Sequence, residues 1–448
     1  MERRGEAPRE TVSVTRERAR TIPAGDVRAR WAWTERSVWT DRMLTALENG
    51  VGGGRWFSLI DKVASLENLF AAYVRVAERD GAAGVDHQTV EAFGERLPER
   101  LDHLVQALRG GRYRPQEVRR VWIPKPGSRE KRPLGIPTVR DRVVQRAVLH
   151  VLEPIFEREF AEHSYGFRPN RGCKDALRRV DDLLKRGYRY VVDADLRSYF
   201  DTIPQERLRE RVAERVSDGR VLDLVSLFLQ QGILDGLAHW NPTEGTPQGA
   251  VISPLLSNIY LNPLDHEMAR SGYEMVRYAD DFVVLCRTEA EAEAALERVR
   301  DWVEANGLCL HPEKTRIADA DGIGFEFLGY HFRASQRWPR KKSLQKLKEV
   351  LRGKTRRTAG ESLKAIIVDI NRTLRGWYEY FKHAHRYVFG RLDQWVRMRL
   401  RSILRKRAGR RGRGRGLDHV KYRNAYFRAA GLFSLEAARI AERRSSMR

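Results

Sequence analysis

The spacing of hydrophobic residues changes its period several times along the chain, and each change predicts a different element. Residues 61–109 show the spacing of amphipathic helices, interrupted at residues 80–86 by a glycine-rich loop. This loop could let a backbone approach a ligand closely, although a plain turn is the simpler interpretation of the loop alone. Residues 118–123 and 134–136 favour two strands, and the segment that joins them, 124–133, is rich in Lys, Arg and Pro. The pattern therefore predicts helices followed by a basic hairpin.

A second hairpin, with acidic residues at its tip, is predicted in the middle of the chain. Residues 273–277 and 282–286 are apolar, strand-like runs on either side of Tyr278-Ala279-Asp280-Asp281. Another short strand is predicted over residues 190–195, and it also ends in an acid. Helical spacing occurs around these strands over residues 142–160, 173–185 and 289–305.

After residue 333 the strand patterns end and basic, helical patterns follow. The apolar positions of three amphipathic helices are Leu344, Leu347, Val350 and Leu351, then Leu363, Ile366, Ile367, Ile370 and Leu374, then Leu392, Trp395, Val396, Leu400, Ile403 and Leu404. Residues 405–416, almost wholly Arg, Lys and Gly, predict a mobile loop. We expect three regions: an N-terminal extension of short helices and loops (1–60), a central α+β body (61–335) and a helical C-terminal domain (340–448).

Composition and charge indicate which kind of partner the protein binds. The chain has 448 residues, of which 42% are hydrophobic, so most of it is expected to fold. It carries 84 Lys and Arg against 60 Asp and Glu, a net charge of +24, which favours a nucleic acid over an anionic membrane surface. No apolar run is long enough to span a bilayer or to form a signal peptide, and the three separated cysteines form no Cys-x-x-Cys pair. A soluble, cytoplasmic protein is expected.

The chemistry is expected at the acidic strand ends. Asp195 and Asp280 are 85 residues apart, but adjacent antiparallel strands could bring them together with Asp281. Two Mg²⁺ ions held by two or three carboxylates can stabilise the attacking and leaving oxygens of nucleotidyl transfer. An isolated Asp-Asp pair is more often a solvated turn. Here the flanks are apolar strands, and acids at the tip of a buried hairpin need compensation.

Residues 278–281 resemble the catalytic tetrapeptide of reverse transcriptases. Around them the chain resembles the bacterial group II intron-encoded reverse transcriptases, or maturases, over nearly its whole length. The resemblance rests on ordered blocks: residues 80–86, 123–137, 164–169, 195–200, 245–249 with 253–256, 306–314 and 327–330. It implies an α+β right-hand polymerase, whose fingers and palm contain an antiparallel sheet, followed by a C-terminal α-helical thumb or maturase domain.

The resemblance implies that Asp195, Asp280 and Asp281 hold two Mg²⁺ ions, with Mn²⁺ as a possible substitute, and that the backbone carbonyl of Leu196 assists. Asp193 competes for this role, since it shares a strand face with Asp195. The ligand of the family precedes an aromatic residue by five positions, which favours Asp195, because Phe200 follows it at that distance.

The same resemblance assigns the nucleotide contacts. Lys125 and Arg132 lie where the family grips the triphosphate, although a solvated loop is the simpler reading of such residues. Phe200 lies where the family excludes a ribose 2′-hydroxyl, and ordinary core packing is compatible with that role. Gln248 and Gly249 match the pair that contacts the incoming nucleotide. Many relatives have a second glycine at position 250, where this chain has Ala250.

Template and intron RNA are expected on basic residues of several blocks. Arg168 belongs to the 164–169 block, for which template contact and packing remain alternatives. Lys314 could neutralise phosphate near the site or be a plain surface lysine. The expected contacts on the helical domain are Arg375, Arg397 and Arg401, beside aromatic side chains that could stack on bases. An amphipathic bundle with a basic outer face is the alternative.

The expected function is RNA-directed DNA polymerisation on an RNA template, with a DNA primer or target and deoxynucleoside triphosphates as substrates. The resemblance also implies binding of group II intron RNA, to assist its splicing and its return to DNA by retrohoming. No segment resembles the cysteine-rich endonuclease of some relatives, so mobility would need a primer made elsewhere, such as at a replication fork. Two alternatives remain: a domesticated reverse transcriptase in phage defence or DNA repair, and an RNA-binding splicing cofactor with a dispensable polymerase.

Overall fold

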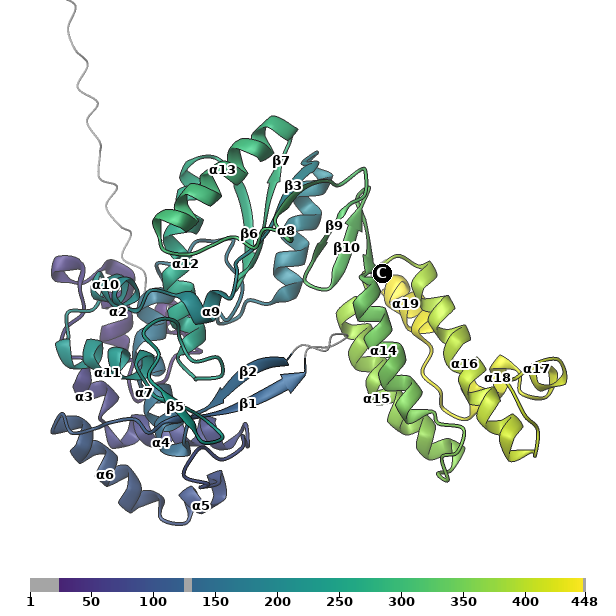
Figure 1. The fold of residues 1–448 in the computed structure, drawn as a ribbon, viewed down its shortest axis with the longest axis horizontal. Helices are drawn as coiled ribbons and strands as arrows, with labels where there is room; N and C mark the ends of the chain where they lie inside the picture. The colour runs from purple at the N-terminus through teal and green to yellow at the C-terminus, as the bar shows by residue number, and fades with distance from the viewer. Residues whose placement is uncertain (1–23, 125–130, 446–448) are drawn as a thin grey trace, which may run out of the picture.

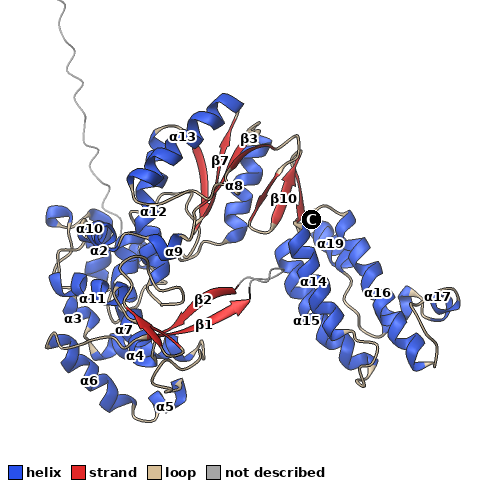
Figure 2. Ribbon diagram, viewed as in Figure 1, coloured by secondary structure: helices blue, strands red, loops and turns tan. Residues whose placement is uncertain are grey.

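The computed structural model describes residues 24–124 and 131–445. A helical base, a four-stranded sheet above it and a wholly helical C-terminal part follow one another in space (Figure 1, Figure 2). One hydrophobic core joins the N-terminal helices to one face of the sheet, and a second core joins the opposite face to the C-terminal helices. Within the described ranges, no helix has the length and apolar character needed to cross a bilayer.

The base is built around one long, buried helix, α7. The N-terminal segment docks on α7 through Trp39, which is fully buried. Trp39 donates its indole N–H to the carbonyl of His150 on α7 at 2.8 Å and packs edge-on against Trp56. The elements of the base are α1 (Ala24–Arg30), α2 (Asp41–Asn49), the 3₁₀ helix η1 (Gly52–Gly54), α3 (Ile60–Val63), α4 (Leu66–Ala77), α5 (Val90–Gly94), α6 (Leu97–Arg109) and α7 (Val139–Glu157).

The basic hairpin extends from this base as part of a sheet with the order β2-β1-β4-β5, which we call the hairpin sheet. Its strands are β1 (Val118–Pro124), β2 (Lys131–Ile136), β4 (Ile233–Asp235) and β5 (Ala238–Trp240). The glycine-rich loop 80–86 packs beside it. A Cβ on Gly84 would lie 2.7 Å from the backbone of Thr138, and Arg119 donates to the carbonyl of Ala83 at 2.6 Å. The close approach of this loop is therefore to protein backbone.

The other four-stranded sheet, the central sheet, has the antiparallel order β6-β7-β3-β8. Alternation along β3 sends Val192 and Ala194 to the first core and Val191 to the second. Helices α12 and α13 cover the first face, and α8 covers the other (Figure 1). The bounds are α8 (Cys173–Lys185), β3 (Tyr190–Asp195), α12 (Ser253–Arg270), β6 (Glu274–Tyr278), β7 (Asp281–Cys286), α13 (Glu289–Ala305) and β8 (Arg316–Asp319).

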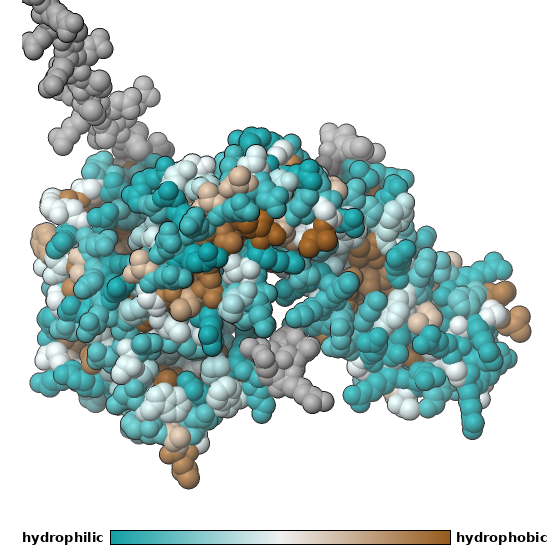
Figure 3. Space-filling model, turned by 45° about the horizontal axis from the view of Figure 1, so that its top comes forward, coloured by the Kyte–Doolittle hydropathy of each residue, from teal (hydrophilic) through white to brown (hydrophobic). Residues whose placement is uncertain are grey.

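Three helices connect β3 to the hairpin sheet, and a small sheet leads to the C-terminal helices. The connecting helices are α9 (Tyr199–Thr202), α10 (Gln205–Ala213) and α11 (Gly219–Leu229). The small sheet consists of β9 (Phe325–Phe327), β10 (Tyr330–Arg333) and β11 (Gln336–Pro339). The C-terminal helices are α14 (Lys341–Lys354), α15 (Leu363–Phe381), α16 (Tyr387–Arg407), α17 (Leu417–Lys421), α18 (Asn424–Ala429) and α19 (Leu435–Ser445). Most of the face shown in Figure 3 is hydrophilic.

Most predicted elements are present, but the structure differs in several places. Strand β11 lies beyond residue 333, where the strands were predicted to end, and the structure also has elements that were not predicted: α9, α10, α11, β4, β5, β8, β9 and β10. The predicted basic loop 405–416 begins as helix, because α16 continues to Arg407. Helices α17, α18 and α19 follow it and were not predicted. Helix α12 was also missed, since it is buried on nearly every side and so lacks an amphipathic pattern.

Candidate active site

Acidic residues from two strands meet where the central sheet ends. Asp195, the last residue of β3, lies opposite Asp281, the first residue of β7, in the antiparallel register. Tyr278 also pairs with Asp281, which leaves Ala279 and Asp280 as the two-residue turn between β6 and β7. The structure thus brings the three predicted catalytic aspartates to one edge of one sheet.

Asp193, the alternative ligand, lies on the same strand face as Asp195. Its carboxylate lies 3.6 Å from the guanidinium of Arg316 on β8. Burial raises the pKa of Asp193 to about 6, and Arg316 opposes this shift. Asp193 lies two residues before the end of β3 and pairs with Arg316 in the register, whereas Asp195 lies at the end of the strand opposite Asp281.

Burial and the neighbouring acids raise the pKa values of Asp280 and Asp281. Burial raises the pKa of Asp281 to about 7, and the negative charges of Asp193, Asp280 and Asp195 add to the shift. Burial and the charge of Asp195 also raise the pKa of Asp280, while Arg277 and Lys314 lower it. Like charges held together in a partly dry site are costly without a cation.

The carboxylate oxygens of Asp195, Asp280 and Asp281 are ligands of the kind that a divalent cation prefers. Mg²⁺ prefers hard oxygen ligands and retains water, so a few carboxylates suffice. Over residues 24–124 and 131–445, no three or more His, Cys, Asp or Glu side chains converge into a preformed metal site. Lys314 provides positive charge beside Asp195, with its Nζ 2.6 Å from Oδ2 of that residue. Lys314 is exposed, so its flexible side chain can move away.

The backbone after Asp195 is fixed by the segment that carries Lys314. His311 donates its N–H to the carbonyl of Asp195 at 2.7 Å, and Arg197 donates to the carbonyl of Cys309 at 2.9 Å. These two bonds bridge Leu196 to Leu310 and do not use the carbonyl of Leu196, the one predicted to assist the metals.

A cavity of about 290 Å³ lies between the hairpin sheet and the segment that follows β3. Two of the residues predicted to contact the nucleotide, Phe200 and Gln248, line it together with Arg120 and Gly245. The Gln248 amide donates to the carboxylate of Asp201 at 3.2 Å, which fixes its side chain at the wall of the cavity. The cavity has the aromatic and polar lining expected for a small polar ligand.

Gly249 needs to be glycine for two reasons. Its φ is +107°, which disfavours an L side chain, and a Cβ there would clash with the carbonyl oxygen of Gly135 on β2. The Gly135 N–H in turn donates to the carbonyl of Gln248 at 2.6 Å. The segment 248–249 is therefore packed directly on the basic hairpin.

The predicted triphosphate contacts lie on that hairpin. Arg132 is exposed on β2, opposite Ile123 on β1. Lys125 lies outside the described residues.

Two of the predicted nucleic-acid contacts are corrected by the structure. Arg168 is buried, and its guanidinium is used by Glu157 at 2.8 Å and by the carbonyls of Ala161 and Ser164. Arg401 is also buried and donates to the carbonyl of Tyr422 at 2.9 Å. Both arginines hold protein segments together, so packing is the reading that the structure supports for them.

The other three predicted contacts remain accessible to different degrees. Arg375 is exposed on α15 and lies over the ring of Phe433 at 4.8 Å. Arg397 is largely covered, its side chain being 15% exposed, and lies near Asp393. Lys314 is exposed and engaged by Asp195, as described above.

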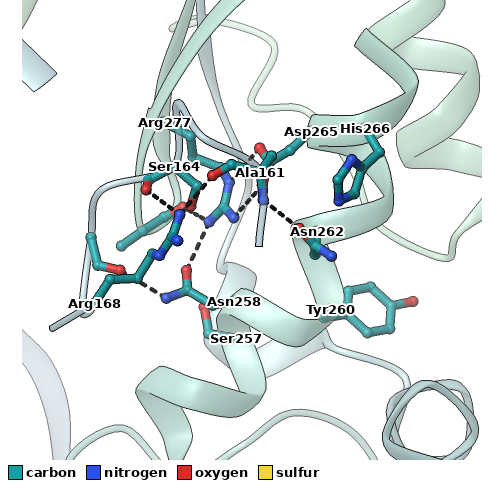
Figure 4. A network of polar contacts seen from close by, with 12 residues as sticks. Ala161, Ser164, Arg168, Ser257, Asn258, Tyr260, Asn262, Asp265, His266 and Arg277 are labelled. Atoms are coloured by element: carbon teal, nitrogen blue, oxygen red, sulfur yellow. Dashed lines mark hydrogen bonds and ion pairs between the residues drawn. The ribbon is translucent and has the colours of Figure 1, made fainter. Parts of the chain in front are cut away.

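The sequence pattern did not reveal Arg277, which lies directly before the acidic tetrapeptide. Its side chain is fully buried and forms a two-pronged ion pair with Asp265 on α12, at 2.7 and 2.5 Å (Figure 4). The same side chain donates to Asn258 at 2.9 Å. In the sequence, an arginine that directly follows the apolar pair Met275-Val276 was a signal for it.

Comparisons with known proteins agree with these observations. Residues 123–332 match the family described as reverse transcriptase (RNA-dependent DNA polymerase), and residues 344–421 match the group II intron, maturase-specific domain. The chain is 38% identical to protein YkfC of Escherichia coli over 293 residues, which is 57% of this chain and 76% of that protein.

A second relative is the group II intron-encoded protein LtrA of Lactococcus lactis. It is 38% identical over 201 residues, which is 44% of this chain but only 32% of that protein. Among solved structures, a partial Cas6-RT-Cas1–Cas2 complex is 23% identical, with a TM-score of 0.36, over 55% of this chain and 41% of the other. The family assignment does not depend on this structural match.

Proposed function

Because the chain belongs to the reverse transcriptases that carry a group II intron maturase-specific domain, we propose that it copies RNA into DNA at a two-metal site on Asp195, Asp280 and Asp281. The observation that carries the proposal is the register of Asp195 opposite Asp281, with Asp280 in the adjoining turn. In this proposal the three carboxylates and the Leu196 carbonyl would hold two Mg²⁺ ions, and bound Mg²⁺ would supply charge stabilisation for the attacking and leaving oxygens of the transfer.

The surroundings of Asp280 and Asp281 favour a bound cation. Burial and mutual repulsion raise the pKa values of Asp280 and Asp281, so the carboxylates favour a cation at the open edge. We propose that the Nζ of Lys314 supplies part of the positive charge beside Asp195. It moves toward the phosphates when substrate binds.

The cavity beside the hairpin is the proposed site of the incoming deoxynucleotide. Phe200 limits the space at the sugar, Gln248 forms part of the wall, and Gly249 lets the backbone behind Gln248 pack on Gly135. Arg132 on the hairpin binds the triphosphate by charge-assisted hydrogen bonds. We propose the same phosphate role for Lys125. The pairing of Gly135 with Gln248 supports this assignment, since it joins the hairpin to the wall of the cavity.

We assign residues 61–335 to fingers and palm and residues 340–448 to a thumb that also binds intron RNA. Helices α14, α15 and α16 carry many Arg and Lys residues, among them the exposed Arg375, beside aromatic side chains. Phosphate contacts and base stacking together suit single-stranded RNA. Assisting the splicing of a group II intron, and returning it to DNA, is the role we propose for this part.

Primer extension on a defined RNA template with Mg²⁺ tests the polymerase assignment. The expected result is extension with deoxynucleotides and little or none with ribonucleotides. RNA binding without any extension, at several Mg²⁺ and Mn²⁺ concentrations, would instead favour an RNA-binding splicing cofactor.

A further inference from the structure

The turn that carries Asp280 is conformationally unfavourable by itself. A two-residue hairpin turn of the usual types requires a positive φ at its first central position, where glycine, asparagine or aspartate are preferred. This chain has Ala279 there, with φ of +60°. An alanine Cβ is crowded in that region, so other contacts must hold the turn in place.

Arg277 provides the contact at the turn. Its Nη1 donates to the carbonyl oxygen of Ala279 at 2.8 Å and also to Oδ1 of Asn258 at 2.9 Å. Its Nε and Nη2 are occupied by the two oxygens of Asp265 on α12. The guanidinium therefore ties the turn to α12 from inside the protein. Figure 4 shows its contacts with Asn258 and Asp265.

A second contact closes the turn from the opposite side. Gly166 lies against Ala279 so closely that a Cβ on it would clash with the backbone nitrogen of Ala279. Asn258 donates its Nδ2 to the carbonyl of Gly166 at 2.7 Å, so one asparagine contacts both Gly166 and Arg277. The N–H of Tyr165 also donates to the carbonyl of Arg277 at 2.9 Å. The turn is thus held between the 164–169 block and the buried arginine.

We propose that Arg277, with Asp265 and Asn258, is a positioning residue of the polymerase: it fixes the strained Ala279 turn so that Asp280 and Asp281 lie where the reaction needs them. This inference rests on the proposed function for its catalytic consequence. It also assigns the 164–169 block a role, which is to support the catalytic turn through Gly166.

The chemistry requires arginine rather than any buried cation. A guanidinium donates in several fixed directions at once, which allows contacts to Asp265, Asn258 and Ala279 from one planar group. A lysine would keep the charge opposite Asp265 but has a single nitrogen, so it loses the fork that joins the carboxylate to the turn. Arg277→Lys therefore separates positioning from charge balance.

The test compares Arg277→Lys with Arg179→Lys. Arg179 on α8 pairs at 2.5 Å with Glu274 on β6, the strand that carries Arg277, and its side-chain bond is to Glu274 and not to the turn. Its variant therefore controls for a changed ion pair at β6. We expect Arg277→Lys to lower kcat by about 100-fold, because an error of about 1 Å in placing catalytic groups has that effect. The KM for deoxynucleotides and the affinity for template and primer should remain close to those of the parent, and Arg179→Lys should keep the parent kcat.

Gly166→Ala provides a second variant, since it displaces the turn while leaving the Arg277 ion pair intact. We expect it to lower kcat in the same way. Retention of the parent kcat by both Arg277→Lys and Gly166→Ala would overturn the proposal. The proposal would also be overturned if Arg179→Lys and Arg277→Lys lost the same melting temperature and the same kcat.

Amide hydrogen exchange gives a readout that does not require polymerase activity. We expect Arg277→Lys to speed exchange in peptides covering residues 278–282, and Arg179→Lys to leave those peptides unchanged. Unchanged exchange at the turn in Arg277→Lys would refute the positioning role. If the parent protein extends no primer, the proposed function fails, and the exchange experiment still decides whether Arg277 holds the turn.

Discussion

Replacing Phe200 by alanine should let the protein accept ribonucleotides. Phe200 lines the cavity of about 290 Å³ beside the hairpin and is only half-buried, so its ring borders the space that a ligand would fill. It packs edge-on against the buried Tyr199, with ring centroids 5.5 Å apart, which limits how far the ring can move aside. Truncation to alanine removes that steric limit.

The size of the effect follows from the volume that separates the two sugars. A ribose 2′-hydroxyl is similar in size to a methylene group, and fitting or rejecting one such group changes transition-state binding by about 1–3 kcal/mol. The ratio of kcat/KM for deoxynucleotides over ribonucleotides should therefore fall by about 10- to 200-fold in Phe200→Ala. Losing a half-buried ring also costs about 1–3 kcal/mol of stability, so the assay belongs well below the melting temperature.

The assay is single-nucleotide primer extension on an RNA template, with the two nucleotide types measured separately. Tyr199→Phe is the matched control, because the Tyr199 hydroxyl donates to the buried carbonyl of Ser257 at 2.7 Å and does not line the cavity. A Phe200→Ala protein that folds, extends primers and keeps the parent selectivity would show that the cavity is not the sugar site.

Three further predictions concern stability and RNA binding. Gly249→Ala should lower the melting temperature and slow extension, since it combines a strained φ, costing about 1–3 kcal/mol, with a clash against Gly135; Gly236→Ala, which has a positive φ but open space, measures the strain alone, and equal effects would exclude the clash. Glu153→Gln should raise the melting temperature at pH 8. Burial raises the pKa of Glu153 to about 7, so between pH 4.5 and 7 the folded state holds a proton that the unfolded state has lost, and stability falls as the pH rises through this range. At pH 8 the folded state carries the buried negative charge, which glutamine removes. The gain should vanish below pH 4.5, and a gain independent of pH would contradict this cause. Affinity for RNA should fall on the order of 10³-fold between 50 and 200 mM salt, and a flat response would refute binding through phosphates.

The sequence carried enough information for the central hairpin because local pattern and chemistry agreed there. Apolar runs on both sides of residues 278–281 predicted β6 and β7, and the structure has both strands. The predicted helix over residues 289–305 is α13 with the same bounds, since Thr288 caps its start and Asn306-Gly307 ends it. Such signals lie within one or two turns of the element that they define.

Features that depend on distant partners could not be predicted in the same way. A buried arginine and an exposed arginine look alike in sequence, so Arg168 and Arg401 were assigned to nucleic acid although Glu157 and Tyr422 engage them. Arg277 was overlooked because its partner Asp265 lies on another element. The burial of α12 likewise comes from several neighbours at once, which removes the amphipathic pattern.

Primer extension by Asp280→Ala tests the central assignment most directly. The account predicts that Mg²⁺-dependent extension on an RNA template is abolished, while RNA binding and the melting temperature stay close to those of the parent. Undiminished synthesis by this variant would contradict the assignment of the catalytic acids.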